Sequence, residues 1–192
     1  MGKPMGTLRC ALPALGLALF AGGCGYNTIQ TKDEAVNAAA SQIKTQLQRR
    51  AELIPNLVET VKGVAAQETT VFNRVSDARS RLAGAVQTGS LQQMAEANAA
   101  LTAPLNRLLA IVENYPDLKS NQNFLQLQDQ LEGTENRIAV ARQDYNRAVE
   151  DFNAYIRRFP YNLTAKIVGR GKPREYFELT NPEAAEAPKV RF

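Results

Sequence analysis

Cys24 is the side chain whose setting best suits chemistry, because it follows three small residues at 21–23 and a short apolar run. A basic segment, residues 1–9, and an apolar run of about 12 residues after it have the pattern of a secretory signal peptide. The junction resembles the bacterial lipobox, in which the cysteine sulfur receives diacylglycerol and the freed amine is acylated. The sequence therefore predicts cleavage before Cys24 and attachment of lipid to this residue.

A transmembrane helix or a myristoylation signal fits this N-terminal region less well. A permanent transmembrane helix needs roughly 20 apolar residues to cross the hydrocarbon core, and this run is shorter. N-myristoylation requires Ser or Thr where the chain has Gly6. The remaining alternative is that Cys24 is an ordinary cysteine after a cleaved leader. Gly25 rather than Asp follows Cys24, which favours an outer-membrane over an inner-membrane address. We therefore expect a lipid-anchored protein of the bacterial cell envelope that faces the periplasm.

The rest of the chain offers little for catalysis or metal binding. Cys10 leaves with the leader and Cys24 carries the lipid, so no free thiol remains. Histidine is absent, which removes the commonest general base and metal ligand. Loss of Lys3 and Arg9 reduces 23 basic residues to 21 against 19 acidic ones, so a nucleic-acid partner is not indicated. We expect no enzyme activity, no metal and no cofactor.

Two long segments have the residue pattern of helices, and these helices must position any functional residues. Apolar residues step by three and four within 36–82 and again within 124–159. A spacing that averages 3.5 keeps one stripe facing a partner helix, so an all-α bundle is predicted. Pro55 interrupts the first pattern without changing its phase, which predicts one bent helix over 33–83 or two nearly collinear helices. A further break near 63–68 fits the same pattern.

The remaining elements follow from turn and capping residues. A helix is expected over 91–114, after a turn at 84–89, and another over 120–158, with Ser120 or Asn121 as its cap. The expected organisation divides the chain into four parts. These are a signal peptide (1–23), a lipid-anchored tether (24–32), a helical bundle with a C-terminal foot (33–177) and a disordered tail (178–192) with too few apolar residues to pack.

Polar side chains fall on the apolar stripes at Arg50, Glu68 and Thr134. A carboxylate on a neighbouring helix, Glu132 or Glu135, could pair with Arg50, and buried pairs of this kind are best attested as devices that set helix register. The alternative is a polar site inside the bundle or an internal docking face. We favour the register role, with Arg50, Glu68, Thr134 and Glu135 as its candidate residues.

Several motifs resemble those of the LemA family over about residues 26–177. They include Leu53-Ile54-Pro55-Asn56-Leu57-Val58-Glu59-Thr60-Val61-Lys62-Gly63, Tyr115-Pro116-Asp117-Leu118-Lys119 and Glu135-Asn136-Arg137-Ile138-Ala139. The resemblance implies an antiparallel up-and-down bundle of four helical segments, with long first and last helices, on an N-terminal membrane anchor. It implies no established catalytic activity. The family usually has Trp where this chain has Ala40, which predicts thinner packing there.

These observations together favour a LemA-like helical-bundle lipoprotein that acts as a non-enzymatic cell-envelope scaffold or adaptor. Its partners would be membrane lipid, through acylated Cys24, and an envelope protein whose identity the sequence does not reveal. The alternative is a lipid- or small-ligand-binding module that uses a crevice between helices, with a gap beside Ala40. An enzyme built on Arg, Glu and Tyr is the weakest hypothesis.

Overall fold

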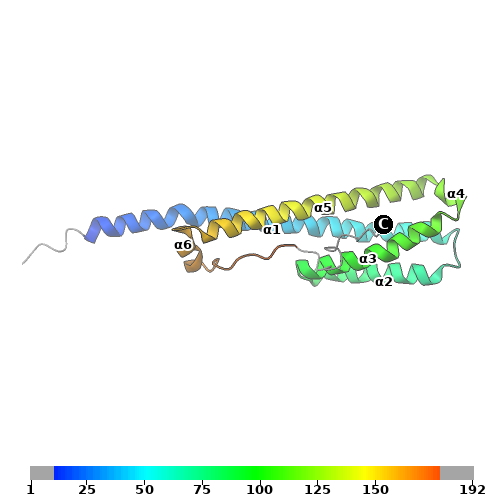
Figure 1. Ribbon diagram of the computed structural model, residues 1–192, viewed down its shortest axis with the longest axis horizontal. Helices are drawn as coiled ribbons and strands as arrows, with labels where there is room; N and C mark the ends of the chain where they lie inside the picture. Colours follow the sequence, from blue (N-terminus) through cyan, green and yellow to red (C-terminus); the bar gives the residue numbers. More distant parts are fainter. Residues whose placement is uncertain (1–10, 178–192) are drawn as a thin grey trace, which may run out of the picture. The chain divides into compact units, whose positions relative to one another are not determined.

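The computed structural model describes residues 11–177, with side chains described from Gly25 onward. Six helices and no strand occur in this part of the chain, which confirms the all-α class (Figure 1). The helices are α1 (Ala11–Lys62), α2 (Thr69–Thr88), α3 (Leu91–Val112), α4 (Pro116–Lys119), α5 (Gln122–Arg157) and α6 (Tyr161–Ile167). The predicted disordered tail, 178–192, lies outside the described residues. Within 11–177, none of the helices is both long and apolar enough to cross a membrane.

The chain forms two compact units, and the two longest helices contribute to both. Of the described residues, unit 1 comprises 11–38 and 145–176, and unit 2 comprises 39–144 and Phe177. The segment 24–32, which the sequence predicts as a tether, lies within α1. Ile29 is fully buried there, because it continues the apolar stripe one heptad before Val36.

In unit 2, the chain reverses direction between α1 and α2. The Arg79 Nε atom donates a hydrogen bond to the carbonyl oxygen of Ala51 at 3.1 Å. These two residues lie about three helical turns from the 63–68 connection, one on either side of it, as in a helical hairpin. The expectation of one bent helix or two nearly collinear helices was therefore wrong, although the further break near 63–68 is present. The apolar spacing did not reveal the reversal, because the same steps of three and four continue through the connection.

Proline and capping residues set the other boundaries of unit 2. As predicted, α1 continues through Pro55. Helix α2 extends to Thr88, past most of the turn predicted at 84–89, and α3 then begins at a capping box. In that box, Ser90 Oγ accepts from Gln93 N at 3.3 Å, and Gln93 Oε1 accepts from Ser90 N at 2.8 Å. Helices α2 and α3 pack against each other (Figure 1).

Asn121 caps α5, as the sequence allows. Its Oδ1 atom accepts hydrogen bonds from the backbone N–H groups of Asn123 at 2.9 Å and Phe124 at 3.2 Å. These bonds satisfy two of the donors that the first helical turn leaves without an intrahelical partner.

The core of unit 1 differs from the predicted stripe near the end of α5. Val149, Phe152 and Ile156 are buried, whereas Phe159, which the heptad pattern places in the core, is 79% exposed. A straight helix has 3.6 residues per turn and drifts away from a strict 3.5 repeat. Helix α5 also ends at Arg157, so the pattern has no helix to follow at residue 159.

Candidate functional site

Two of the predicted polar residues come together in unit 2. Arg50, on α1, forms an ion pair through Nη1 with Glu135 on α5. The same nitrogen donates a hydrogen bond to Asn98 Oδ1, on α3, at 2.8 Å. One guanidinium group therefore connects three helices, which is the geometry that a register device requires.

The two partners of this ion pair have unequal access to solvent. The Arg50 side chain is 5% exposed, whereas that of Glu135 is 52% exposed. Burial lowers the pKa of Arg50 from its ordinary value, and the negative charge of Glu135 partly offsets this effect. The Arg50 Nε atom is also buried, and it has no hydrogen-bond partner among the described residues. The charge of Arg50 therefore depends on the ion pair for its stabilisation, because it is buried, whereas the half-exposed carboxylate of Glu135 is also stabilised by water.

The other two predicted polar residues are placed differently. Thr134 is fully buried, but its hydroxyl donates to the carbonyl oxygens of Gln130 and Leu131 in its own helix, so it needs no partner on another helix. Glu68 is only half-buried and lies at the N-terminal boundary of α2, without a side-chain capping bond. The expectation that Glu68 is a core residue is corrected, because α1 ends before it. The side chain of Cys24 is not among those that the structure describes, so acylation of this residue stays a prediction.

A second cluster, in unit 1, surrounds a buried carboxylate that sequence reasoning missed. Asp33, on α1, has a side chain that is 3% exposed. It accepts hydrogen bonds from Arg174 Nε at 3.1 Å and Arg174 Nη2 at 2.6 Å, and it forms a further ion pair with Arg170. Both Arg174 nitrogens donate to the same oxygen, Asp33 Oδ1, while Arg170 meets Oδ2, and these bonds join α1 to the segment that follows α6.

Side chains of α5 hold the same segment, which has no regular secondary structure of its own. Asn153 Nδ2 donates to the carbonyl oxygen of Arg174 at 2.9 Å, and Asn153 Oδ1 accepts from its N–H at 2.8 Å. The Tyr145 hydroxyl donates to the carbonyl oxygen of Glu175 at 2.9 Å. Burial raises the pKa of Tyr145, while nearby Arg174 lowers it to a smaller extent. The cluster around Asp33 thus fastens an extended segment to two helices.

A signal for this cluster was present in the sequence. Asp33 lies on the α1 stripe, midway between the buried Ile29 and Val36, in the same way that Arg50 lies on it further along. Its arginine partners are 137 and 141 residues away in the chain. They belong to a segment without periodicity, so no spacing rule connects them with Asp33.

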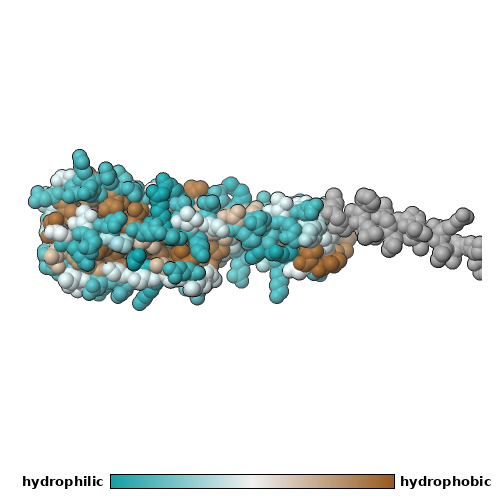
Figure 2. Space-filling model, turned by 180° about the vertical axis from the view of Figure 1, so that it is seen from behind, coloured by the Kyte–Doolittle hydropathy of each residue, from teal (hydrophilic) through white to brown (hydrophobic). Residues whose placement is uncertain are grey.

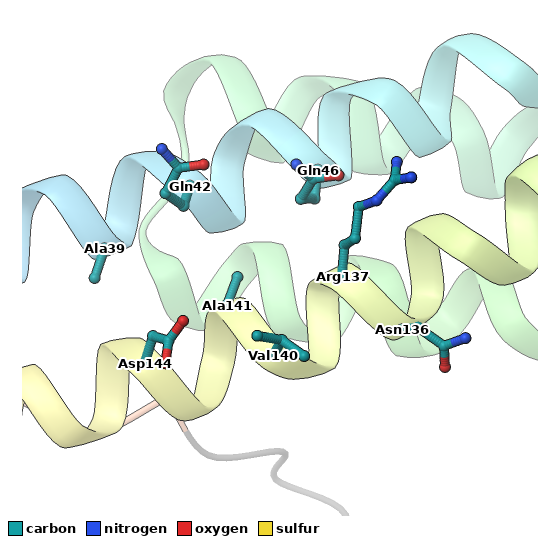
Figure 3. Close-up of a pocket in the computed structure, with 8 residues that line it drawn as sticks. All are labelled: Ala39, Gln42, Gln46, Asn136, Arg137, Val140, Ala141 and Asp144. Atoms are coloured by element: carbon teal, nitrogen blue, oxygen red, sulfur yellow. The ribbon is translucent and has the colours of Figure 1, made fainter.

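A lateral groove of about 430 Å³ runs between α1 and α5 in unit 2. Its lining residues are Ala39, Gln42, Gln46, Asn136, Arg137, Val140, Ala141 and Asp144 (Figure 3). Figure 3 shows Arg137 reaching from α5 toward α1 near Gln46, with Ala39 and Asp144 at the other end. The Gln46 Oε1 atom is buried and accepts no hydrogen bond from any described residue.

The groove differs from the gap in the core that was expected beside Ala40. It is lined by Ala39, whereas Ala40, which is half-buried, does not line it. Five of the eight lining residues are polar or charged, but the surface that they present to the groove is mostly apolar, and Val140 is 56% exposed. Within the described residues, no group of three or more His, Cys, Asp or Glu side chains is placed to hold a metal ion.

Comparison with known proteins identifies relatives from the family that the sequence motifs resemble. A family profile described as the LemA family matches residues 39–192. Magnetosome proteins MamQ 1 and MamQ 2 of Paramagnetospirillum magneticum are each 32% identical over 80% of this chain and 64% of their own length. Protein LemA of Metamycoplasma hominis is 23% identical over 73% of this chain and 63% of its own length. The chain therefore spans less than two thirds of the length of these relatives. The profile match confirms the resemblance seen in the motifs, and the chain belongs to the LemA family.

Proposed function

We propose that this protein is a lipid-anchored, non-enzymatic scaffold or adaptor of the bacterial cell envelope. Cys24 is its acylation site, and the groove between α1 and α5 is its docking face. The anchor places the protein on the periplasmic side of a membrane, and Gly25 after the cysteine favours the outer membrane. The relatives are named for a family or for the magnetosome rather than for a reaction, which supports a structural role.

The groove is the observation that carries the docking part of this proposal. The small side chains of Ala39 and Ala141 allow a partner backbone to approach α1 and α5 closely. Gln46 Oε1 is a buried acceptor that a donor on the partner would satisfy, and such unsatisfied groups are rare in folded proteins. A helix or extended segment of an envelope protein fits these features.

Charge gives the groove a direction. Arg137 and Asp144, of opposite charge, are seven residues apart on α5, which is about 10 Å along the helix. A partner segment with an acidic side chain at one end would favour the orientation that places this end near Arg137. Complementary charges of this kind set specificity more than affinity.

Crosslinking in intact cells tests the docking face. A photo-reactive residue at Val140, inside the groove, should yield a discrete adduct with one envelope protein, which mass spectrometry of the adduct identifies. The matched control is Leu125, which is also exposed on α5 but does not line the groove. The same adducts from both positions, or none from Val140, would contradict the adaptor role of the groove.

Fractionation tests the anchor independently. Cys24→Ser should release the protein from washed membranes, whereas Cys10→Ser should not, because Cys10 is removed with the leader. Unchanged membrane association of the Cys24→Ser protein would count against acylation as the anchor.

The second candidate function is binding of a lipid or small ligand in the same groove. The volume of about 430 Å³ favours it, because ligand sites commonly have about 300–1,000 Å³. This function predicts that a hydrophobic ligand raises the unfolding temperature of the purified protein. It also predicts that Val140→Glu, which places a charge in the groove, abolishes the effect. No shift across a panel of lipids would exclude it in favour of the adaptor.

A further inference from the structure

An apolar patch on unit 1 has no role in the function proposed above. Phe159, Leu163 and Ile167 are 79%, 54% and 85% exposed. They are spaced by four residues, and Leu163 and Ile167 lie one turn apart on the same side of α6. Figure 2 shows apolar atoms gathered over α6. We call these three residues the α6 patch. Clustered exposure of large apolar side chains marks an interaction surface.

Basic residues lie close to the α6 patch in the sequence, on both sides of it and within it. From 152 to 174 the chain has six basic residues and no acidic one. Four of the six are exposed, while the other two, Arg170 and Arg174, pair with Asp33. The exposed ones are Arg157, Arg158, Lys166 and Lys172. Apolar side chains flanked by Lys and Arg are the composition that binds the interface of an anionic lipid leaflet.

The same region packs against the start of the described side chains, next to the predicted lipid attachment site. A Cβ atom built on Gly25 would lie 2.6 Å from Cδ1 of Tyr161, the first residue of α6, so the two residues are in close contact. The Tyr161 ring stacks on Tyr155 of α5, with centroids 4.4 Å apart. Gly25 directly follows Cys24. Helix α6 therefore contacts the residue next to the one that would carry the acyl groups.

We propose that the α6 patch is a second membrane contact, which inserts Phe159, Leu163 and Ile167 into the interfacial region of an anionic leaflet. The inference deepens the proposed anchoring but depends on residues other than Cys24. Insertion removes three apolar side chains from water and brings the four exposed cations to the lipid headgroups. Two such points of attachment would fix the orientation of unit 1 on the bilayer, which a single flexible acyl anchor does not.

The chain contains no tryptophan, so the fluorescence of a single introduced Trp reports on the environment of that position alone. Phe159→Trp and Ile167→Trp each place a single Trp at an exposed position of the α6 patch, and Leu125→Trp is the matched exposed control in unit 2, outside the groove between α1 and α5. Each full chain is expressed in a host that processes lipoproteins. The purified protein is then reconstituted into vesicles of phosphatidylglycerol and phosphatidylethanolamine with brominated acyl chains. Circular dichroism verifies that every variant keeps the helical content of the parent.

The two patch reporters should shift to shorter emission wavelength and lose most of their emission to bromine quenching, whereas Leu125→Trp should lose little. Equal, weak quenching of all three would overturn the proposal. A blue shift that depends on protein concentration, without vesicles and without lipid quenching, would assign the α6 patch to self-association and also overturn it.

The mass of the N-terminal peptide, measured on the same samples, separates this inference from the proposed anchor. An acylated Cys24 with unquenched patch reporters means that the anchor is right and the membrane-contacting patch is wrong. An unmodified Cys24 with quenched patch reporters means the reverse.

Discussion

Replacement of Asp33 by Asn removes the negative charge at the centre of the unit 1 cluster and leaves the shape of the side chain nearly unchanged. The carboxylate accepts two hydrogen bonds from Arg174 and pairs with Arg170. In Asp33→Asn, the amide keeps one oxygen as an acceptor, and its NH₂ group cannot accept from a guanidinium. The segment that follows α6 should therefore detach more often from α1.

The size of the effect follows from the exposure of the partners. Breaking a fully buried ion pair costs about 3–5 kcal/mol, and a hydrogen bond to a charged group contributes about 1.5–3 kcal/mol. Asp33 is 3% exposed, but the side chains of Arg170 and Arg174 are 39% and 38% exposed and regain water when released. We therefore expect a loss of about 2 kcal/mol, which corresponds to about a 30-fold increase in local opening.

Hydrogen exchange at the backbone N–H of Arg174 measures this opening, because that group donates to Asn153 Oδ1 when the segment is attached. Exchange should be about 30-fold faster in Asp33→Asn. Asp151→Asn is the matched control in unit 1, since Asp151 is 67% exposed and lies 3.8 Å from Lys32. An exposed pair of this kind contributes about 0–1 kcal/mol. Equal exchange rates in the two variants would show that the Asp33 carboxylate does not keep this segment attached to α1.

Three further changes test other parts of the structure by urea denaturation. Glu135→Gln should destabilise the protein by about 2 kcal/mol, because it leaves the buried guanidinium of Arg50 without its charge partner, while Glu132→Gln should cost under about 0.5 kcal/mol. Tyr145→Phe should cost about 1 kcal/mol at neutral pH. Because burial raises the pKa of Tyr145, its stabilising effect is complete below about pH 10 and is lost as the pH rises through the raised value, so Tyr145→Phe should show a smaller alkaline loss. Ser90→Ala should cost about 1 kcal/mol through loss of the helix cap.

The features that depend on a periodic arrangement of apolar residues could be predicted from the sequence. The all-α class and the burial of most stripe positions followed from the 3.5-residue spacing. The sequence also predicted that a carboxylate on a neighbouring helix, Glu132 or Glu135, pairs with Arg50, and the structure shows that this partner is Glu135. The Asn121 cap is a local property and was also visible.

Features that depend on chain reversal or on aperiodic segments were not visible. The reversal at 63–68 keeps the apolar spacing of a continuous helix, so the pattern cannot distinguish the two. Phe159 belongs to the stripe by spacing, but α5 ends two residues before it. The environment of Asp33 depends on a segment whose conformation is set by side-chain hydrogen bonds rather than by a repeat.

The mass of the mature N-terminal peptide shows whether Cys24 is the acylated N-terminus of the protein. The protein is purified from membranes of a bacterium that processes lipoproteins, and the peptide is analysed intact. We expect a chain that begins at Cys24 and carries diacylglycerol on the sulfur and an acyl group on the amine. A chain that begins elsewhere, or an unmodified Cys24 in the membrane fraction, would contradict this expectation.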